Sequence, residues 1–151
     1  DREGLEAYFQ AHKDNYKWSE PRFKGYLIYA SNDSVLNAVE NAIDTLGSDT
    51  LFVSLRKQFK GNIRIEYQLA KKGENAVVDE IAFGGKKAEN PGRFPVYFAY
   101  DYKVIEQPEE AIDVKGLVTS DYQSQLEEQW VAQLRNKYKV KINKKVLKQV
   151  Q

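Results

Sequence analysis

The segment Arg22–Ala30, RFKGYLIYA, constrains the fold more than any other stretch of the chain. In a β-strand, successive side chains point to opposite faces of the sheet. One face of this segment carries Phe23, Leu27 and Tyr29, and the other carries Tyr26 and Ile28. Because both faces are apolar, both must be covered, and we predict an interior strand.

Periodicity elsewhere predicts helices and further strands around this one. Apolar residues recur at helical spacing over residues 3–16, 34–46 and 49–59. They alternate with polar residues over residues 63–69, which predicts a half-buried strand. A further strand is predicted over residues 96–105, with Phe98, Tyr100, Tyr102 and Val104 on one face.

Turn and capping residues set the predicted ends of these elements. The run SNDS offers N-cap residues for the second helix, which Gly47 ends, and Ser48 and Asp49 start the third, which Gly61 ends. Residues 76–83 fit either a strand or a short helix. The Gly- and Pro-rich residues 84–95 predict a long surface loop.

This order of elements predicts an α+β fold, with helices packed on a mainly antiparallel sheet. A chain of 151 residues, 42% of them hydrophobic, is long enough to close one sizeable core. We therefore predict a single domain over residues 1–151. Its core spans about residues 20–105, and helices 3–16 and 120–138 pack together as a terminal lobe.

The helix over residues 120–138 starts at a capping box formed by Ser120 and Gln123. Apolar side chains fall on its successive turns, namely Tyr122, Leu126, Trp130, Leu134 and Tyr138. We expect this stripe to pack on the first helix, with the Trp130 ring in the core; a Trp130 ring outside the core would instead face a partner. The following segment, YKVKIN, predicts a short strand whose alternate lysines protect an exposed edge.

The alternative interpretation of this basic tail is a patch that binds nucleic acid or another polyanion. The whole chain has 23 basic and 22 acidic residues, and its net charge of +1 provides no general attraction for polyanions. The edge strand is therefore preferred, and no nucleic-acid partner is expected. No run of about 18 apolar residues exists, so membrane insertion is not expected either.

The residue types that carry most enzyme chemistry are scarce. The one histidine, His12, lies on the apolar face of the first helix, where packing against an aromatic neighbour explains it best. Cysteine is absent, so the chain offers too few nitrogen and sulfur ligands for a metal site. Acidic neighbours such as Asp79 and Glu80 are interpreted as solvated surface. We expect no catalytic residue, no metal and no cofactor.

Tyrosine and phenylalanine are plentiful, with ten and seven copies. Rings gathered on one sheet face would bind unfolded peptide, because they give a large contact area with few torsions to order. The candidate peptide-binding residues are Tyr26, Tyr29, Phe98, Tyr100 and Tyr102. As an alternative, Tyr26, Tyr29, Phe98 and Tyr100 could line an unconventional pocket for proline isomerisation.

Two segments resemble the SurA-like periplasmic chaperones and peptidyl-prolyl isomerases of Bacteroides-type bacteria. The first is DVKGLVTSDYQSQLEEQWVAQLRNKYKVKINKKVL, and the second is YFQAHKDNYKWSEPRFKGYLIYA. In the first, the similarity includes Gly116–Gln123, Leu126, Glu127, Trp130, Leu134, Arg135, Tyr138, Val140 and Ile142. The resemblance implies a parvulin-type (PpiC-type) sheet domain with N- and C-terminal helices. It also implies a periplasmic location.

Parvulins of this family use a pair of histidines in the sheet, together with a cysteine or an aspartate. This chain has no positions that match the pair, so no catalytic residue is transferred. The expected function is binding of unfolded, proline-containing or outer-membrane client polypeptides, with isomerase activity weak or absent. The alternatives are an active peptidyl-prolyl cis-trans isomerase and a non-catalytic interaction domain of the cell envelope.

The chain opens on DREGLEAYF, without an initiator methionine or an apolar signal region. We therefore expect that residues were removed upstream of Asp1. A periplasmic protein would carry its signal peptide there.

Overall fold

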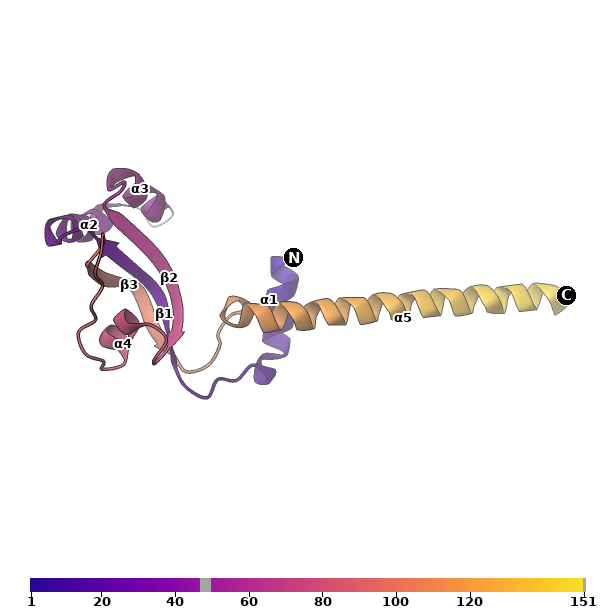
Figure 1. The fold of residues 1–151 in the computed structure, drawn as a ribbon. Coiled ribbons are helices and arrows are strands. Elements are labelled where there is room, and N and C mark those ends of the chain that lie inside the picture. The colour runs from indigo at the N-terminus through magenta and orange to yellow at the C-terminus, as the bar shows by residue number, and fades with distance from the viewer. Residues whose placement is uncertain (47–49, 151) are drawn as a thin grey trace. The chain divides into compact units, whose positions relative to one another are not determined.

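The computed structural model describes residues 1–46 and 50–150, and it describes side chains as far as Lys139. The fold is α+β with an antiparallel sheet, as the sequence predicts, and the sheet of the described residues has three strands. Two compact units are present (Figure 1). The sheet unit comprises Trp18–Gln107, and the helical unit combines Asp1–Lys17 with Pro108–Gln151.

The sheet has the order β2-β1-β3, so β1 (Arg22–Ala30) is the central strand, and the predicted interior strand is confirmed. Its neighbours are β2 (Ile63–Lys71) and β3 (Val96–Ile105), and both run antiparallel to it. Every residue of β1 has a partner in β2. The register between β1 and β2 is therefore unbroken.

The pairing of β1 with β3 contains a bulge. Tyr26 pairs with Tyr100, but Lys24 pairs with Lys103, so β3 has one residue more than β1 over this interval. Asp101 lies within that interval and has a φ of 47°, a left-handed conformation. An extra residue of this kind interrupts the two-residue alternation, and the side chains that follow exchange faces.

The bulge makes the prediction for the faces of β3 wrong. Phe98 and Tyr100 lie on one face, as expected, but Tyr102 stacks on Phe23 of the opposite face with ring centres 5.2 Å apart. Val104 pairs directly with Phe23 and shares that opposite face. Residue spacing alone cannot reveal a bulge, because the alternation of apolar residues continues through it.

Three helices cover the two faces of the sheet (Figure 1). On one face lie α2 (Asp33–Thr45) and α3 (Leu51–Gln58), and on the other lies α4 (Ala76–Ala82). The predicted start of α2 is confirmed, since the Asn32 side chain accepts a hydrogen bond from the Val35 N–H at 2.9 Å. The capping residues predicted at 47–49 lie outside the described residues.

The ambiguous segment 76–83 is helical. The Asn75 side chain accepts hydrogen bonds from the N–H groups of Val77 at 2.9 Å and Val78 at 3.1 Å, which satisfies the first amides of α4. Residues 84–95 form neither helix nor strand, which confirms the predicted loop.

Two apolar clusters enclose the sheet. The cluster under α4 contains Phe23, Leu27, Tyr29, Ala70, Val77, Val78 and Ala88. The cluster under α2 and α3 contains Ile28, Val39, Leu51 and Leu55. The alternation of apolar residues in β1 thus supplies both clusters, which is why this strand lies in the centre.

The helical unit contains α1 (Arg2–Ala11), a 3-10 turn (Lys13–Asn15), a second 3-10 turn (Ala111–Val114) and α5 (Lys115–Val150). The predicted helix over 3–16 is thus confirmed as far as Ala11, and a 3-10 turn follows where the prediction continued the helix. Phe9 is fully buried and stacks on Tyr16 with ring centres 5.8 Å apart. The Tyr8 and Tyr122 rings, 5.7 Å apart, join α1 to the start of α5.

Three predictions for the C-terminal segment are wrong. The helix begins at Lys115, so Ser120 and Gln123 lie inside α5 and form no capping box at its start. The segment YKVKIN is part of α5 and forms no strand. The described sheet consists of β2, β1 and β3, and none of these strands pairs with this segment. As part of a helix, the segment forms its backbone hydrogen bonds internally. Trp130 is 62% exposed and lies outside the core. The ten-residue α1 spans only about 15 Å, and it packs against the first turns of α5.

Candidate peptide-binding face

A row of three tyrosines crosses the sheet, one from each strand. Tyr26 of β1 pairs directly with Tyr67 of β2 on one side and with Tyr100 of β3 on the other. Directly paired residues in antiparallel strands project from the same face of the sheet. The three side chains therefore form one row on the face that carries α2 and α3.

Phe52 of α3 joins this row. Its ring centre lies 4.5 Å from that of Tyr26 and 6.0 Å from that of Tyr100, and the Tyr26 and Tyr67 rings are 5.4 Å apart. The rings are tilted or edge-on, arrangements that favour contact between aromatic groups. We call Tyr26, Phe52, Tyr67 and Tyr100 the aromatic shelf.

The shelf lies where the helical cover of this sheet face ends. The row on one side of it consists of Ile28, Ile65 and Phe98, which pack in the cluster under α2 and α3. The row on the other side begins with Lys24 and Leu69, which are only partly buried. Tyr67 is exposed, and the other three shelf rings are half-buried. The shelf therefore presents aromatic surface to solvent.

The five candidate residues from the sequence are divided between the two faces. Tyr26, Phe98 and Tyr100 lie on the face of the shelf, with Phe98 in the row beneath the helices. Tyr29 is buried on the opposite face, where the Arg64 guanidinium lies 4.5 Å from its ring centre. Tyr102 also lies on the opposite face, because of the bulge at Asp101.

Two members of the shelf, Tyr67 and Phe52, were not among the candidates predicted from the sequence. Tyr67 belongs to the predicted strand over 63–69, and its place opposite Tyr26 follows only from the register of β1 and β2. Phe52 was assigned to a helix, and its contact with the sheet depends on how α3 packs. The alternation in each strand was visible in the sequence, whereas the pairing between strands was not.

The opposite face of the sheet contains a hydrogen-bonded carboxylate. Glu80 of α4 accepts from the Tyr97 hydroxyl and from the Ala88 N–H at 2.7 Å. These bonds lower the pKa of Glu80, while burial and the bond to Glu80 raise the pKa of Tyr97 to about 12. Burial also raises the pKa of Tyr29. The Glu80 contacts hold the loop over 84–95 against α4 and β3.

His12 has the structural role that the sequence predicts. Its ring stacks on Tyr8 with centres 4.0 Å apart, and its Nδ1 lies 2.8 Å from the Tyr8 carbonyl oxygen. Within residues 1–46 and 50–139, whose side chains are described, no group of three or more His, Cys, Asp or Glu side chains is placed to hold a metal ion. None of the described helices combines the length and apolar character that a membrane crossing requires.

The described residues thus place an aromatic surface on the sheet face that α2 and α3 cover in part. Comparisons with protein-family models, with curated proteins and with solved structures find no match for this chain.

Proposed function

We propose that the chain is part of a SurA-like periplasmic folding factor and that the aromatic shelf binds unfolded client polypeptides. One observation carries the proposal, namely the row of Tyr26, Tyr67 and Tyr100 on a sheet face that α2 and α3 cover only in part. The clients would be outer-membrane or secreted proteins that have not yet folded.

Aromatic rings suit a client whose sequence varies. A tyrosine ring gives a large apolar contact with only two side-chain torsions to order, and its hydroxyl can exchange hydrogen bonds with any peptide group. Contact through rings requires no fixed client sequence. The shelf joins four rings on one surface, so an extended segment that crosses it can contact several of them at once.

The edge of the sheet next to the shelf supports the same role. β2 is an outer strand of the three-stranded sheet, and its register with β1 is unbroken over nine residues. An extended peptide can add to such an edge through backbone hydrogen bonds, while alternate side chains reach the neighbouring face. A client added to β2 would place those side chains beside Tyr67.

The proposed family role is that of a parvulin-like binding domain with weak or absent isomerase activity. Rotation about a peptide bond has a barrier of about 18–20 kcal/mol, and lowering it requires a shaped, desolvated pocket. The shelf is an open surface, with Tyr67 exposed at its end. The resemblance in the terminal segments supports the family, and the open surface supports binding without turnover.

The test compares two tyrosines of similar exposure on opposite faces. Tyr67 is 43% exposed on the shelf, and Tyr102 is 46% exposed on the face of α4. We expect Tyr67→Ala to weaken the suppression of aggregation of an unfolded outer-membrane barrel protein, and Tyr102→Ala to leave it unchanged. Equal loss in both variants, or no suppression by the unaltered chain at molar excess, would contradict the proposal.

A protease-coupled isomerisation assay addresses the remaining enzymatic role. We expect the rate with a proline-containing peptide to stay at the uncatalysed level for the unaltered chain. Turnover well above that level, lost in Tyr67→Ala, would instead make the shelf an isomerase site.

A further inference from the structure

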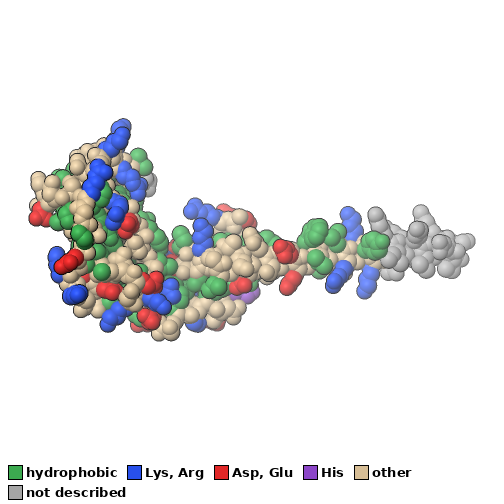
Figure 2. Space-filling view, viewed as in Figure 1, with side chains coloured by type: hydrophobic (Ala, Val, Ile, Leu, Met, Phe, Trp, Pro, Cys, Tyr) green, Lys and Arg blue, Asp and Glu red, His purple; other side chains and the backbone are tan. Residues whose placement is uncertain are grey.

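The part of α5 beyond its contact with α1 carries an exposed row of apolar side chains, which we call the apolar stripe. Its members are Leu126 (45% exposed), Trp130 (62%), Val131 (39%), Leu134 (47%) and Tyr138 (70%). Figure 2 shows apolar side chains along this part of the helix. Large apolar side chains grouped in this way on a surface mark an interaction site.

The stripe has the size of a small interface. Side chains of these types and exposures leave roughly 500 Å² of apolar surface on one helix, so two such stripes would bury about 1,000 Å² together. That area is at the lower limit for specific association. A partner with a stripe of the same length is therefore sufficient to cover it.

The stripe is complementary to itself when one copy is reversed. In an antiparallel pair centred on residue 132, Leu126 faces Tyr138 and Trp130 faces Leu134, because each pair of numbers is symmetric about that position. All four side chains lie on adjoining turns of one helix face, at i, i+4 spacing. These four side chains thus meet apolar groups of the second copy, whereas Val131 lies opposite Gln133.

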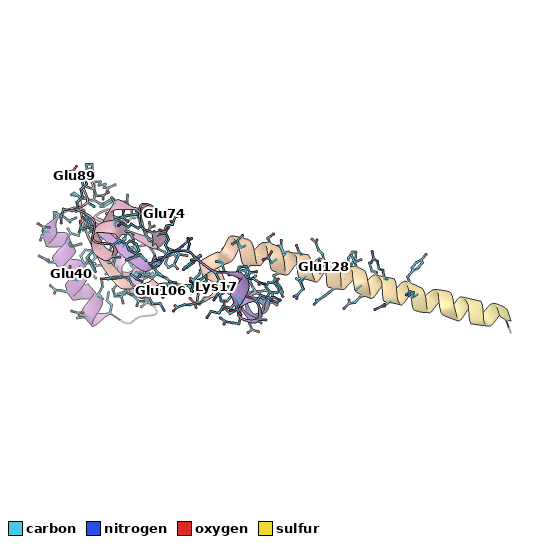
Figure 3. All side chains as sticks on the ribbon, turned by 90° about the horizontal axis from the view of Figure 1, so that it is seen from below. Lys17, Glu40, Glu74, Glu89, Glu106 and Glu128 are labelled. Carbon is cyan, nitrogen blue, oxygen red and sulfur yellow. The ribbon has the colours of Figure 1, made fainter. Side chains whose placement is uncertain are left out.

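The charges near the stripe select the same orientation. Glu127 and Lys137 are also symmetric about residue 132, so each would face its opposite charge in the second copy. In a parallel pair, Glu127 would face Glu127 and Lys137 would face Lys137, and like charges would repel. Glu128 and Arg135 add to this polarity of acidic and basic ends (Figure 3, where Glu128 is labelled).

We propose that α5 pairs in antiparallel orientation with α5 of a second copy of this chain. The pairing buries the apolar stripe of each copy and joins Glu127 of one to Lys137 of the other. Opposed helix dipoles favour this orientation too. The proposal is independent of the shelf and of client binding, because it involves only residues of the helical unit.

Sedimentation equilibrium of the full chain over a roughly hundredfold concentration range tests the association. We expect a reversible monomer–dimer equilibrium that Leu134→Asp weakens at least tenfold. Val53→Asp is the matched control, since Val53 is 69% exposed on α3 and lies outside the stripe. A monomer at every concentration, or equal loss in the control, would overturn the proposal.

A charge exchange tests the orientation. Glu127→Lys and Lys137→Glu should each weaken the dimer, whereas the double variant should restore it, because each exchanged side chain would again face the opposite charge in the other copy. These side chains are on the surface, and circular dichroism verifies that the helix is retained. A double variant weaker than either single variant would overturn the antiparallel arrangement. A monomeric chain whose stripe binds only a different polypeptide would overturn the pairing itself.

Discussion

Two regions of one helix, α5, have the same four-residue spacing of apolar residues but differ in whether those residues are buried. In its first turns Val118 is fully buried and Tyr122 packs on Tyr8 of α1. From Leu126 onward the apolar residues keep the same four-residue spacing, yet they are exposed. The spacing of apolar residues therefore determines which face of a helix is apolar. Whether that face is buried depends on a second element that packs against it.

The packed region is held by contacts between segments that are distant in sequence. The Tyr16 hydroxyl donates to Asp121 Oδ2 at 2.6 Å, and the Ala111 N–H donates to Glu6 Oε2 at 3.0 Å. Burial, and then the bond to Asp121, raise the pKa of Tyr16 well above its ordinary value. Among the interactions described, the exposed region has no such hydrogen bonds to distant segments. Substitutions in the two regions should therefore change the free energy of unfolding by very different amounts.

The largest effect is expected for Phe9→Ala. Phe9 is fully buried between α1 and the rest of the helical unit, and its ring stacks on Tyr16. Loss of a buried phenylalanine ring removes its apolar contacts and leaves a cavity, so the free energy of unfolding should fall by about 3–5 kcal/mol. Urea denaturation followed by circular dichroism measures it. A change below about 1 kcal/mol would mean that α1 does not form the core of this unit.

A smaller effect is expected for Gly4→Ala. Alanine is normally favoured over glycine inside a helix by about 1 kcal/mol. Here a Cβ at position 4 would overlap the Tyr122 hydroxyl, so we expect a net loss of about 1–2 kcal/mol in the free energy of unfolding.

The matched background for Gly4→Ala is Tyr122→Phe, which removes the overlapping hydroxyl. In that background the same substitution should lower the free energy of unfolding by less, as measured by the same denaturation experiment, since the Asp1 carboxylate and the ring carbon of residue 122 stay close to the added Cβ. Stabilisation by Gly4→Ala in the unaltered chain would show that α1 and α5 are not in close contact at this point.

Tyr16→Phe removes the hydrogen bond to Asp121 but keeps the ring. The free energy of unfolding at neutral pH should fall by about 1 kcal/mol. Because the pKa of Tyr16 is raised in the folded chain, its contribution is fully present below the unfolded pKa of about 10 and is lost as the pH rises through the folded pKa. The difference in free energy of unfolding between the variant and the unaltered chain should therefore shrink as the pH rises above about 10. A difference that grows there would contradict the raised pKa.

The smallest effect is expected for Trp130→Ala, measured at a concentration low enough to keep the chain monomeric. Since the ring is largely exposed, the free energy of unfolding should change by about 0.5 kcal/mol or less. Replacement of the same residue type in a core typically removes about 3–5 kcal/mol. A loss of that size would place Trp130 in the packed region and remove the difference between the two parts of α5.

Much of the sheet unit was predictable because residues close in sequence, through apolar periodicity and capping side chains, determine its strands and helices. The alternation in Arg22–Ala30 predicted the central strand, and Asn32 lies in the predicted capping run. The bulge at Asp101 was not predictable, since an extra residue leaves the apolar pattern intact while it reverses the faces of Tyr102 and Val104.

The aromatic shelf and the end of α5 depend on non-local information. The shelf arises from the register between strands, which brings Tyr67 opposite Tyr26, and from the packing of Phe52. The alternating Lys and Val residues after Tyr138 suggested a strand, but a strand requires a neighbour with which to pair. The sequence shows where apolar residues recur and does not show which element will lie beside them.

The first turns of α5 are packed and its later turns are exposed, and this difference also determines how fast its backbone amides exchange hydrogen with solvent. Amides in the first turns open only when the packed unit unfolds, so their exchange should be slow. Amides near Leu134 are held by the helix alone, and isolated helical segments open and close within about a microsecond. Their exchange should therefore be fast in the monomer and slower when α5 is paired, which makes the protection of this segment a direct measure of its occupancy.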